Sequence, residues 1–117
     1  MKNKNILSSI KLSFIGLFTA IKKEKNFKFY LINIIITLCL NICFGFTIIE
    51  YFIWAITIVG VFSTECINTA IEYLCNFLTE QKNDKIKIIK DISAGAVLCW
   101  GLAFYIFEIA IIGVKFL

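Results

Sequence analysis

Residues 52–76 read FIWAITIVGVFSTECINTAIEYLCN, and this stretch decides how the rest of the chain is interpreted. Its first thirteen residues, Phe52 to Thr64, carry no charge, which is typical of a helix in hydrocarbon. Two glutamates, Glu65 and Glu72, follow in the same apolar context. An ionised carboxylate in a membrane costs at least about 2.5–3.5 kcal/mol. The pair therefore predicts either a functional site or a buried contact between helices.

A helical arrangement places the polar residues of this stretch on one face. At about 100° per residue, Asn68 lies at about 300° from Glu65, Glu72 at about 340° and Asn76 at about 20°. Thr69 lies next to them on the helix surface. This alignment predicts a polar stripe at one end of a membrane helix. A structural helix–helix contact through Asn68 and Thr69 is the alternative interpretation.

The composition places the stripe in an all-α integral membrane protein. The 117 residues are 60% hydrophobic, with a mean hydropathy of +0.88, and a soluble domain of this size could not bury so much apolar surface. There is no proline, and strand and hairpin signals are missing. The chain has no histidine and five cysteines in or beside apolar runs, which argues against zinc, haem and iron–sulfur sites.

Charge and hydropathy divide residues 1–117, which are expected to form one domain. Residues 29–49, 51–75 and 92–114 are predicted to be three transmembrane helices. Residues 1–28 are predicted to carry an amphipathic helix that lies on the membrane surface. The polar, lysine-rich residues 76–91 are predicted to form a loop on the same side.

The lysines predict the orientation. Of the twelve basic residues, all lysine, seven lie in residues 1–28, four in 82–90 and one at Lys115, while the turn at Glu50 has none. Both basic segments are therefore expected to be cytoplasmic. The C-terminus would then lie outside, where Glu108 is expected to extend toward water. No nucleic-acid partner is expected, because no base-reading groups accompany the lysines.

Other charged residues are expected at the same membrane face as the stripe. Glu24 precedes the first span, and Lys90 and Asp91 precede the third. Carboxylate oxygens there suit Mg²⁺, which often binds one or two carboxylates together with substrate phosphates. Phosphoryl transfer needs a metal, positioning and a base near the attacking hydroxyl. Glu65, deeper than Glu72, is suitably placed to meet a lipid hydroxyl.

A second hypothesis is a small oligomeric transporter that uses membrane carboxylates for proton or cation coupling. It accounts for Glu65 and Glu72. It leaves Glu24 and the Lys90–Asp91 pair at the membrane rim without a role, and a transporter more naturally places its carboxylate near the midplane.

Three segments resemble one known family. ECINTAIE (65–72), Lys90-Asp91 with SAGAV (93–97), and KEKNFKF (23–29) are similar to the signatures of the prokaryotic diacylglycerol kinases, which include the undecaprenol kinases. The resemblance covers about residues 8–114. It implies a small membrane lipid kinase that assembles as a homotrimer with active sites shared between subunits.

The resemblance also implies an activity and a location. The chain would use Mg²⁺ and ATP to phosphorylate the hydroxyl of undecaprenol or diacylglycerol at the cytoplasmic interface of the bacterial cell (inner) membrane. The product would feed cell-wall lipid-carrier or phospholipid metabolism. The SAGAV and KEKNFKF segments favour undecaprenol over diacylglycerol.

Four site residues and their roles follow from the resemblance. Glu65 would be the general base that activates the lipid hydroxyl. Glu24 and Glu72 would hold Mg²⁺ together with ATP. Asn68 would orient the lipid head or Glu65.

On the nucleotide side, the resemblance implies that Lys90 and Asp91 contact the phosphates and the sugar region of ATP. The loop 80–84 would add contacts through Gln81, Lys82 or Asn83, although it lacks a histidine common in the family. Asn76 stands where the family usually has an aspartate, and it cannot carry that residue's charge.

Overall fold

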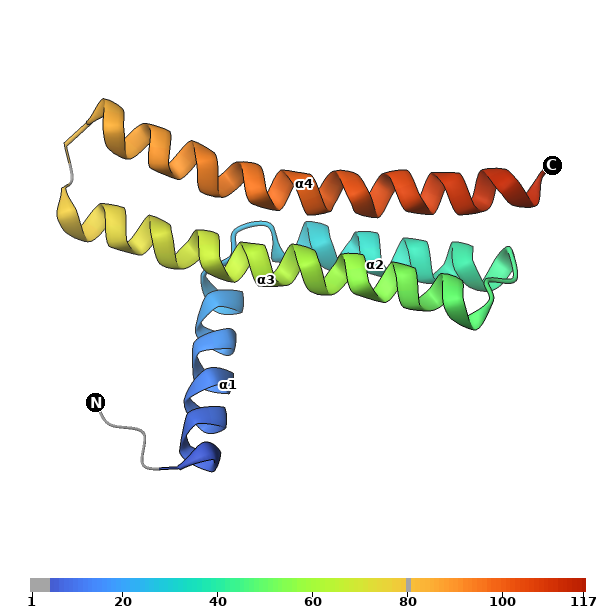
Figure 1. Cartoon of the computed structure of the whole chain (residues 1–117), viewed down its shortest axis with the longest axis horizontal. Coiled ribbons are helices and arrows are strands. Elements are labelled where there is room, and N and C mark those ends of the chain that lie inside the picture. Colours follow the sequence, from blue (N-terminus) through green and yellow to red (C-terminus); the bar gives the residue numbers. More distant parts are fainter. Residues whose placement is uncertain (1–4, 80) are drawn as a thin grey trace.

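The computed structural model describes residues 5–79 and 81–117, and these residues form four helices and no strand. The helices are α1 (Ile6–Lys23), α2 (Phe27–Cys43), α3 (Ile48–Leu78) and α4 (Asp84–Lys115). α2, α3 and α4 run side by side, and α1 turns away from α2 by 98° (Figure 1). The prediction of an all-α chain is confirmed for this described part.

Membrane-spanning length is clearest for α3 and α4. They have 31 and 32 residues and are both long and apolar enough to cross a bilayer. Their lengths are about 46 and 48 Å, whereas the hydrocarbon core is about 30 Å thick. A third crossing is added if the bent pair of α1 and α2 counts as one span. A multi-pass membrane protein is therefore confirmed, with two or three crossings.

The first predicted span, residues 29–49, is longer than the helix that forms there. α2 has 17 residues and ends at Cys43, so it covers only about 25 Å. Gly45 ends it by adopting a φ of 67°, a conformation that a Cβ would disfavour. Glu50, expected to mark the turn, lies instead in the first turn of α3.

The predicted loop 76–91 is mostly helical. α3 continues to Leu78 and α4 begins at Asp84, so among the described residues of this segment only Thr79 and residues 81–83 lie outside helices; Glu80 is outside the described residues. The Asn83 side chain caps α4 by accepting hydrogen bonds from the N–H groups of Lys85 (2.9 Å) and Ile86 (3.2 Å). The predicted spans ended where the sequence becomes polar. A helix can extend beyond the membrane into a polar segment, however, when a capping residue satisfies its terminal N–H groups.

α1 begins at a similar cap. The Asn5 side chain accepts a hydrogen bond from the Ser8 N–H (2.8 Å), and Lys22 and Lys23 occupy the last turn. Phe14 and Phe18 are exposed on this helix. The helix is where the sequence predicted it, while its position on the membrane surface stays a prediction. The prediction for residues 1–4 lies outside the described residues.

Two contacts fix how α3 is aligned along its neighbours, one with α4 and one with α2. Gly60 of α3 lies so close to Trp100 of α4 that a Cβ there would overlap the indole ring. The Trp54 indole N–H donates to the Thr37 hydroxyl of α2 (2.8 Å). A small residue lets the backbone approach a large ring, which is how membrane helices commonly pack.

Glu108 does not extend toward water as the sequence predicted. Its side chain is only 6% exposed, and the fully buried Asn41 of α2 lies beside it. The direction of its Cβ on α4 decides this, because that face of the helix packs on its neighbours.

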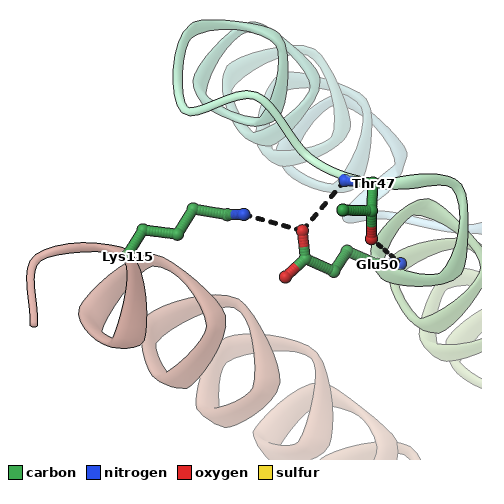
Figure 2. A network of polar contacts seen from close by, with 3 residues as sticks. All are labelled: Thr47, Glu50 and Lys115. Carbon is green, nitrogen blue, oxygen red and sulfur yellow. Dashed lines mark hydrogen bonds and ion pairs between the residues drawn. The ribbon is translucent and has the colours of Figure 1, made fainter.

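A polar network closes the end of the bundle near the C-terminus (Figure 2). The Lys115 ammonium pairs with the Glu50 carboxylate (2.8 Å), which also accepts from the Thr47 N–H (2.9 Å). The Thr47 hydroxyl in turn accepts from the Glu50 N–H (3.3 Å). Lys115 also lies 5.5 Å from the centre of the Phe46 ring. The end of α4 is thus joined to the α2–α3 turn.

Candidate active site

The predicted polar stripe of α3 forms one connected group. The Asn68 amide nitrogen donates to the Glu72 carboxylate (3.1 Å) and, more weakly, to the Glu65 carboxylate (3.4 Å). Asn68 is buried, Glu65 is half-buried and Glu72 is exposed. The two carboxylates therefore lie at different depths on one helix face, with an amide between them.

Ser93 of α4 holds this amide in place. Its hydroxyl donates to the Asn68 side-chain oxygen and also lies 3.1 Å from the Lys90 carbonyl oxygen. With its oxygen accepting from Ser93, Asn68 must direct its nitrogen toward the carboxylates. Sequence reasoning included Ser93 in the SAGAV segment but gave it no role. Its place before a small-residue run on a membrane helix was the available signal.

Glu24 joins the stripe from the bend between α1 and α2. It follows the last residue of α1, and its N–H donates to the Ile21 carbonyl (3.2 Å). Its carboxylate accepts from the Asn26 N–H (2.9 Å). The 98° bend directs the side chain toward α3, so a residue 41 positions before Glu65 in sequence shares its site.

The surroundings of Glu24 raise the pKa of its carboxyl group to about 7. Burial is the largest cause, and a hydrogen bond with Glu65 and repulsion from Glu65 and Glu72 add to it. Glu65 and Glu72 are therefore close enough to disfavour the charged form of Glu24. A cation between them would relieve that repulsion.

All three carboxylates line one cleft of about 570 Å³. Lys23 and Lys25 stand at its rim, and the Lys23 ammonium lies 6.0 Å from the Tyr73 ring centre. Asn68, Thr69 and Asn76 supply neutral polar groups. The cleft thus offers acidic ligands on one wall and ammonium groups nearby.

The structure separates Lys90 and Asp91 from this cleft. Lys90 donates to the Asn76 side-chain oxygen (2.8 Å), and the exposed Asp91 pairs with Lys87 (2.7 Å). Both line a neighbouring cleft of about 760 Å³ that includes Gln81, Lys82 and Asn83. Asn76 lines both clefts. The predicted residues therefore form two adjoining groups that meet at Asn76.

Tyr30 is a site residue that sequence reasoning missed. Its hydroxyl donates to the Glu65 carboxylate at 2.7 Å, which is shorter than the contact from Asn68. An aromatic residue near the start of a span is also typical of the interfacial aromatic belt, so nothing in the sequence distinguished Tyr30 as a site residue. Only the packing of α2 against α3 brings the two side chains together.

An apolar cavity of about 320 Å³ adjoins the carboxylate cleft. Phe29, Ile34, Phe62, Leu98 and Phe104 are among the residues that line it. Three further residues, Tyr30, Ala94 and Val97, line both the cavity and the cleft. A molecule with a hydrocarbon body and a polar head would find both environments side by side.

The donor set fits a metal ion that also binds a phosphate. No group of three or more His, Cys, Asp or Glu side chains within residues 5–79 and 81–117 is arranged to hold a metal by itself. Mg²⁺ typically uses one or two carboxylates and completes its octahedron with phosphate oxygens and water. Glu24 and Glu72, which both line the cleft, would meet that requirement with hard oxygen ligands.

Comparison with known proteins gives two consistent matches. The family model described as prokaryotic diacylglycerol kinase matches residues 11–112, which include all six predicted site residues. An undecaprenol kinase of Bacillus subtilis (strain 168) is 34% identical over 82 residues, or 70% of this chain and 67% of that protein. No solved structure shows a significant match.

Proposed function

The chain belongs to the prokaryotic diacylglycerol kinase family and is a lipid kinase, and from that premise we propose that it transfers phosphate from Mg·ATP to undecaprenol. The reaction takes place at the cytoplasmic face of a bacterial cell membrane. The choice of undecaprenol is supported by the Bacillus subtilis relative, which carries that lipid in its name. Diacylglycerol is the other acceptor named by the family.

One observation carries the proposal: Glu24, Glu65 and Glu72, from two separate parts of the chain, line a single cleft beside an apolar cavity. A lipid kinase has to join a hydrocarbon-bound hydroxyl to a metal-bound phosphate. The apolar cavity suits the hydrocarbon, and the carboxylates suit the metal and the hydroxyl proton.

Glu65 is the general base in this proposal. It is half-buried beside the apolar cavity, so a lipid hydroxyl can approach its carboxylate from the membrane side. As the carboxylate takes the proton, the lipid oxygen forms a bond to the γ-phosphorus and the bond to the β-phosphate oxygen breaks. ADP leaves with that oxygen, and Glu65 later returns its proton to water.

Glu24 and Glu72 would hold Mg²⁺ together with the ATP phosphates. The metal, when bound, would neutralise charge that develops on the phosphoryl oxygens. Ser93 supports this arrangement indirectly, because it fixes Asn68, whose amide contacts Glu72 and Glu65. Glu72 is more exposed than Glu65, in keeping with a ligand that meets a nucleotide from the aqueous side.

Lys90 binds the nucleotide phosphates, and Asp91 lies on the sugar side. Lys90 and Asp91 line the cleft that adjoins the carboxylates at Asn76, so one extended ligand could occupy both clefts. Asn76 is neutral, and its hydrogen bond leaves the charge of Lys90 available to a phosphate.

We place the N-terminus and the 82–90 segment in the cytoplasm, with α1 on the membrane surface and three chains assembled as a homotrimer. Lysine placement supports the orientation. The homotrimer is what the resemblance of residues 8–114 to the family implies. The mass of the protein in detergent would give the number of copies.

The deciding experiment offers radiolabelled ATP and Mg²⁺ to the purified full chain with undecaprenol or diacylglycerol in separate mixed micelles. We expect labelled undecaprenyl phosphate as the main product. Labelled phosphatidic acid instead would reassign the lipid. No labelled lipid from either would overturn the reaction and favour ion coupling at the same carboxylates.

A further inference from the structure

We propose that Tyr30 is a positioning residue for the reaction, and that its hydroxyl fixes the Glu65 carboxylate so that one oxygen is presented to the lipid. The inference rests on the proposed function, because it concerns how the base of that reaction is held. Neither the family match nor the relative assigns a role to this tyrosine.

The contact itself is close and comes from a rigid group. The Tyr30 hydroxyl donates to Glu65 Oε2 at 2.7 Å, a length typical of a charge-assisted hydrogen bond. Tyr30 also packs edge-to-face against Phe29 and Phe62, with ring centres 6.0 and 6.2 Å apart. A phenol has few rotatable bonds, so a packed ring delivers its hydroxyl to a fixed point.

The remaining contacts leave the other carboxylate oxygen available. Glu65 Oε1 receives the longer contact from Asn68, at 3.4 Å. The Glu24 carboxyl is also within hydrogen-bonding reach of Glu65. Of the contacts from Tyr30 and Asn68, that from Tyr30 is the shorter, and it is made to Oε2, so Oε1 is the oxygen that accepts the lipid proton.

Tyr30 lies where a lipid hydroxyl would meet Glu65, so its hydrogen bond can affect the reaction. Tyr30 lines both the carboxylate cleft and the apolar cavity, so its hydroxyl lies at their junction. A lipid hydroxyl that arrives from the hydrocarbon side meets Glu65 at this junction. A glutamate side chain that is free to rotate would direct its carboxylate away from the lipid hydroxyl much of the time, and general-base catalysis depends strongly on that geometry.

The test is Tyr30→Phe in the full chain, assayed with undecaprenol, Mg²⁺ and ATP in mixed micelles. Loss of one hydrogen bond to a charged group should lower kcat on the order of tenfold to 100-fold. The KM values for ATP and for the lipid should stay near those of the wild type, since the ring and the metal ligands remain. Tyr51→Phe is the matched control, because Tyr51 lies in the first turn of α3, outside both the cleft and the cavity.

A double-mutant cycle with Glu65→Asp separates positioning from a structural role. Aspartate keeps the carboxylate but shortens the side chain, which withdraws it from the hydroxyl while leaving measurable turnover. We expect Tyr30→Phe to cost much less in the Glu65→Asp background than in the wild type. An equal loss in both backgrounds, or a loss that follows a lower melting temperature and raised KM values, would overturn the inference.

The outcomes also distinguish this inference from the proposed function. If wild-type chain phosphorylates the lipid and Tyr30→Phe turns over at the wild-type rate, only the role of Tyr30 is wrong. If the wild type phosphorylates neither lipid, the reaction is wrong and the role of Tyr30 is overturned with it.

Discussion

The carboxylates at the two ends of the helical bundle differ in whether they form an ion pair. At the C-terminal end, Glu50 pairs with Lys115 and completes the capping box of α3 (Figure 2). At the α1 end, none of the ion pairs within residues 5–79 and 81–117 involves Glu24, Glu65 or Glu72. At one end the carboxylate pairs with an ammonium group and joins helices, whereas at the other three carboxyl groups share a cleft with Lys23 and Lys25 but form no ion pair with them. That difference indicates which end awaits a ligand.

The depth of the carboxylates sharpens the comparison. Glu50 and Lys115 keep 23% of their side-chain surface, so this ion pair is largely shielded but still reaches water. Glu65 is half-buried between a tyrosine and an amide. Retaining a carboxylate there without an ammonium partner is unfavourable for folding. A chemical role explains why it is tolerated.

Glu65→Gln should have the largest effect of the variants considered. Glutamine keeps the size of the side chain but cannot accept the hydroxyl proton, so turnover should fall by about 10²–10⁴-fold while nucleotide binding survives. Glu50→Gln at the opposite end is the control and should retain turnover. The measurements are single-turnover lipid phosphorylation and ATP binding, and near-wild-type turnover of Glu65→Gln would remove its role as base.

Glu72→Ala tests the metal assignment. Loss of one carboxylate ligand should raise the KM for Mg·ATP on the order of tenfold to 100-fold and shift activation to higher Mg²⁺ concentrations. Titration of turnover against Mg²⁺ at fixed ATP provides the measurement. An unchanged Mg²⁺ dependence would show that Glu72 is not a ligand.

Gly60→Ala tests the close packing of α3 on α4 between the two ends of the bundle. The added methyl group would overlap the Trp100 ring, so α3 and α4 must move apart, at a cost of about 1–3 kcal/mol. Gly113→Ala is the matched control, because nothing lies within 4 Å of a Cβ at that position. Thermal unfolding in detergent micelles measures the difference, and equal stability of the two variants would contradict this close contact.

The raised pKa of Glu24 predicts a pH dependence of stability in metal-free protein. The pKa is about 7 in the folded chain against 4.5 without the fold, so folding favours the protonated form. The stabilising contribution is complete below the unfolded pKa and is lost as the pH rises through the folded pKa.

Melting temperatures in EDTA at about pH 5.5 and about pH 8.5 should therefore show greater stability at the lower pH, and Glu24→Gln should reduce that difference. Added Mg²⁺ should recover stability at the higher pH, because a cation favours the ionised carboxylates. A Glu24→Gln variant with the wild-type pH dependence would assign the effect to another group.

The smallest effect is expected from breaking the ion pair at the C-terminal end. Lys115→Met should lower stability by no more than about 1 kcal/mol, because partly exposed pairs contribute little. Turnover should remain unchanged. A loss of turnover without unfolding would mean that the two ends are coupled, and the contrast between them would need revision.

Much of the site could be predicted because it lies on one helix. The spacing of Glu65, Asn68 and Glu72 is a helical repeat, so their shared face followed from the sequence. Charge and hydropathy placed Glu24 at the same membrane face as the stripe, but nothing local indicates the 98° bend that directs it toward α3. Tyr30 could not be found, because its role depends on the packing of α2 against α3.

The fold was predictable to a similar degree. Apolar runs gave the helices and their order, but not where they end. Gly45 shortened α2, and the Asn83 cap allowed α4 to begin before the apolar region. Glu108 illustrates the remaining limit, because hydropathy identifies a charged residue in a span but not whether its face of the helix meets water or a neighbouring helix.

The sequence by itself determined an all-α membrane chain with a stripe of carboxylates and amides on one helix, because hydropathy and helical periodicity are local properties. The tertiary structure decided the remaining features: that Glu24 joins the stripe, that Lys90 lies in an adjoining cleft, and that Tyr30 holds Glu65. These depend on the bend after α1 and on how α2, α3 and α4 pack, and such contacts between distant residues leave no periodic signal in a single chain.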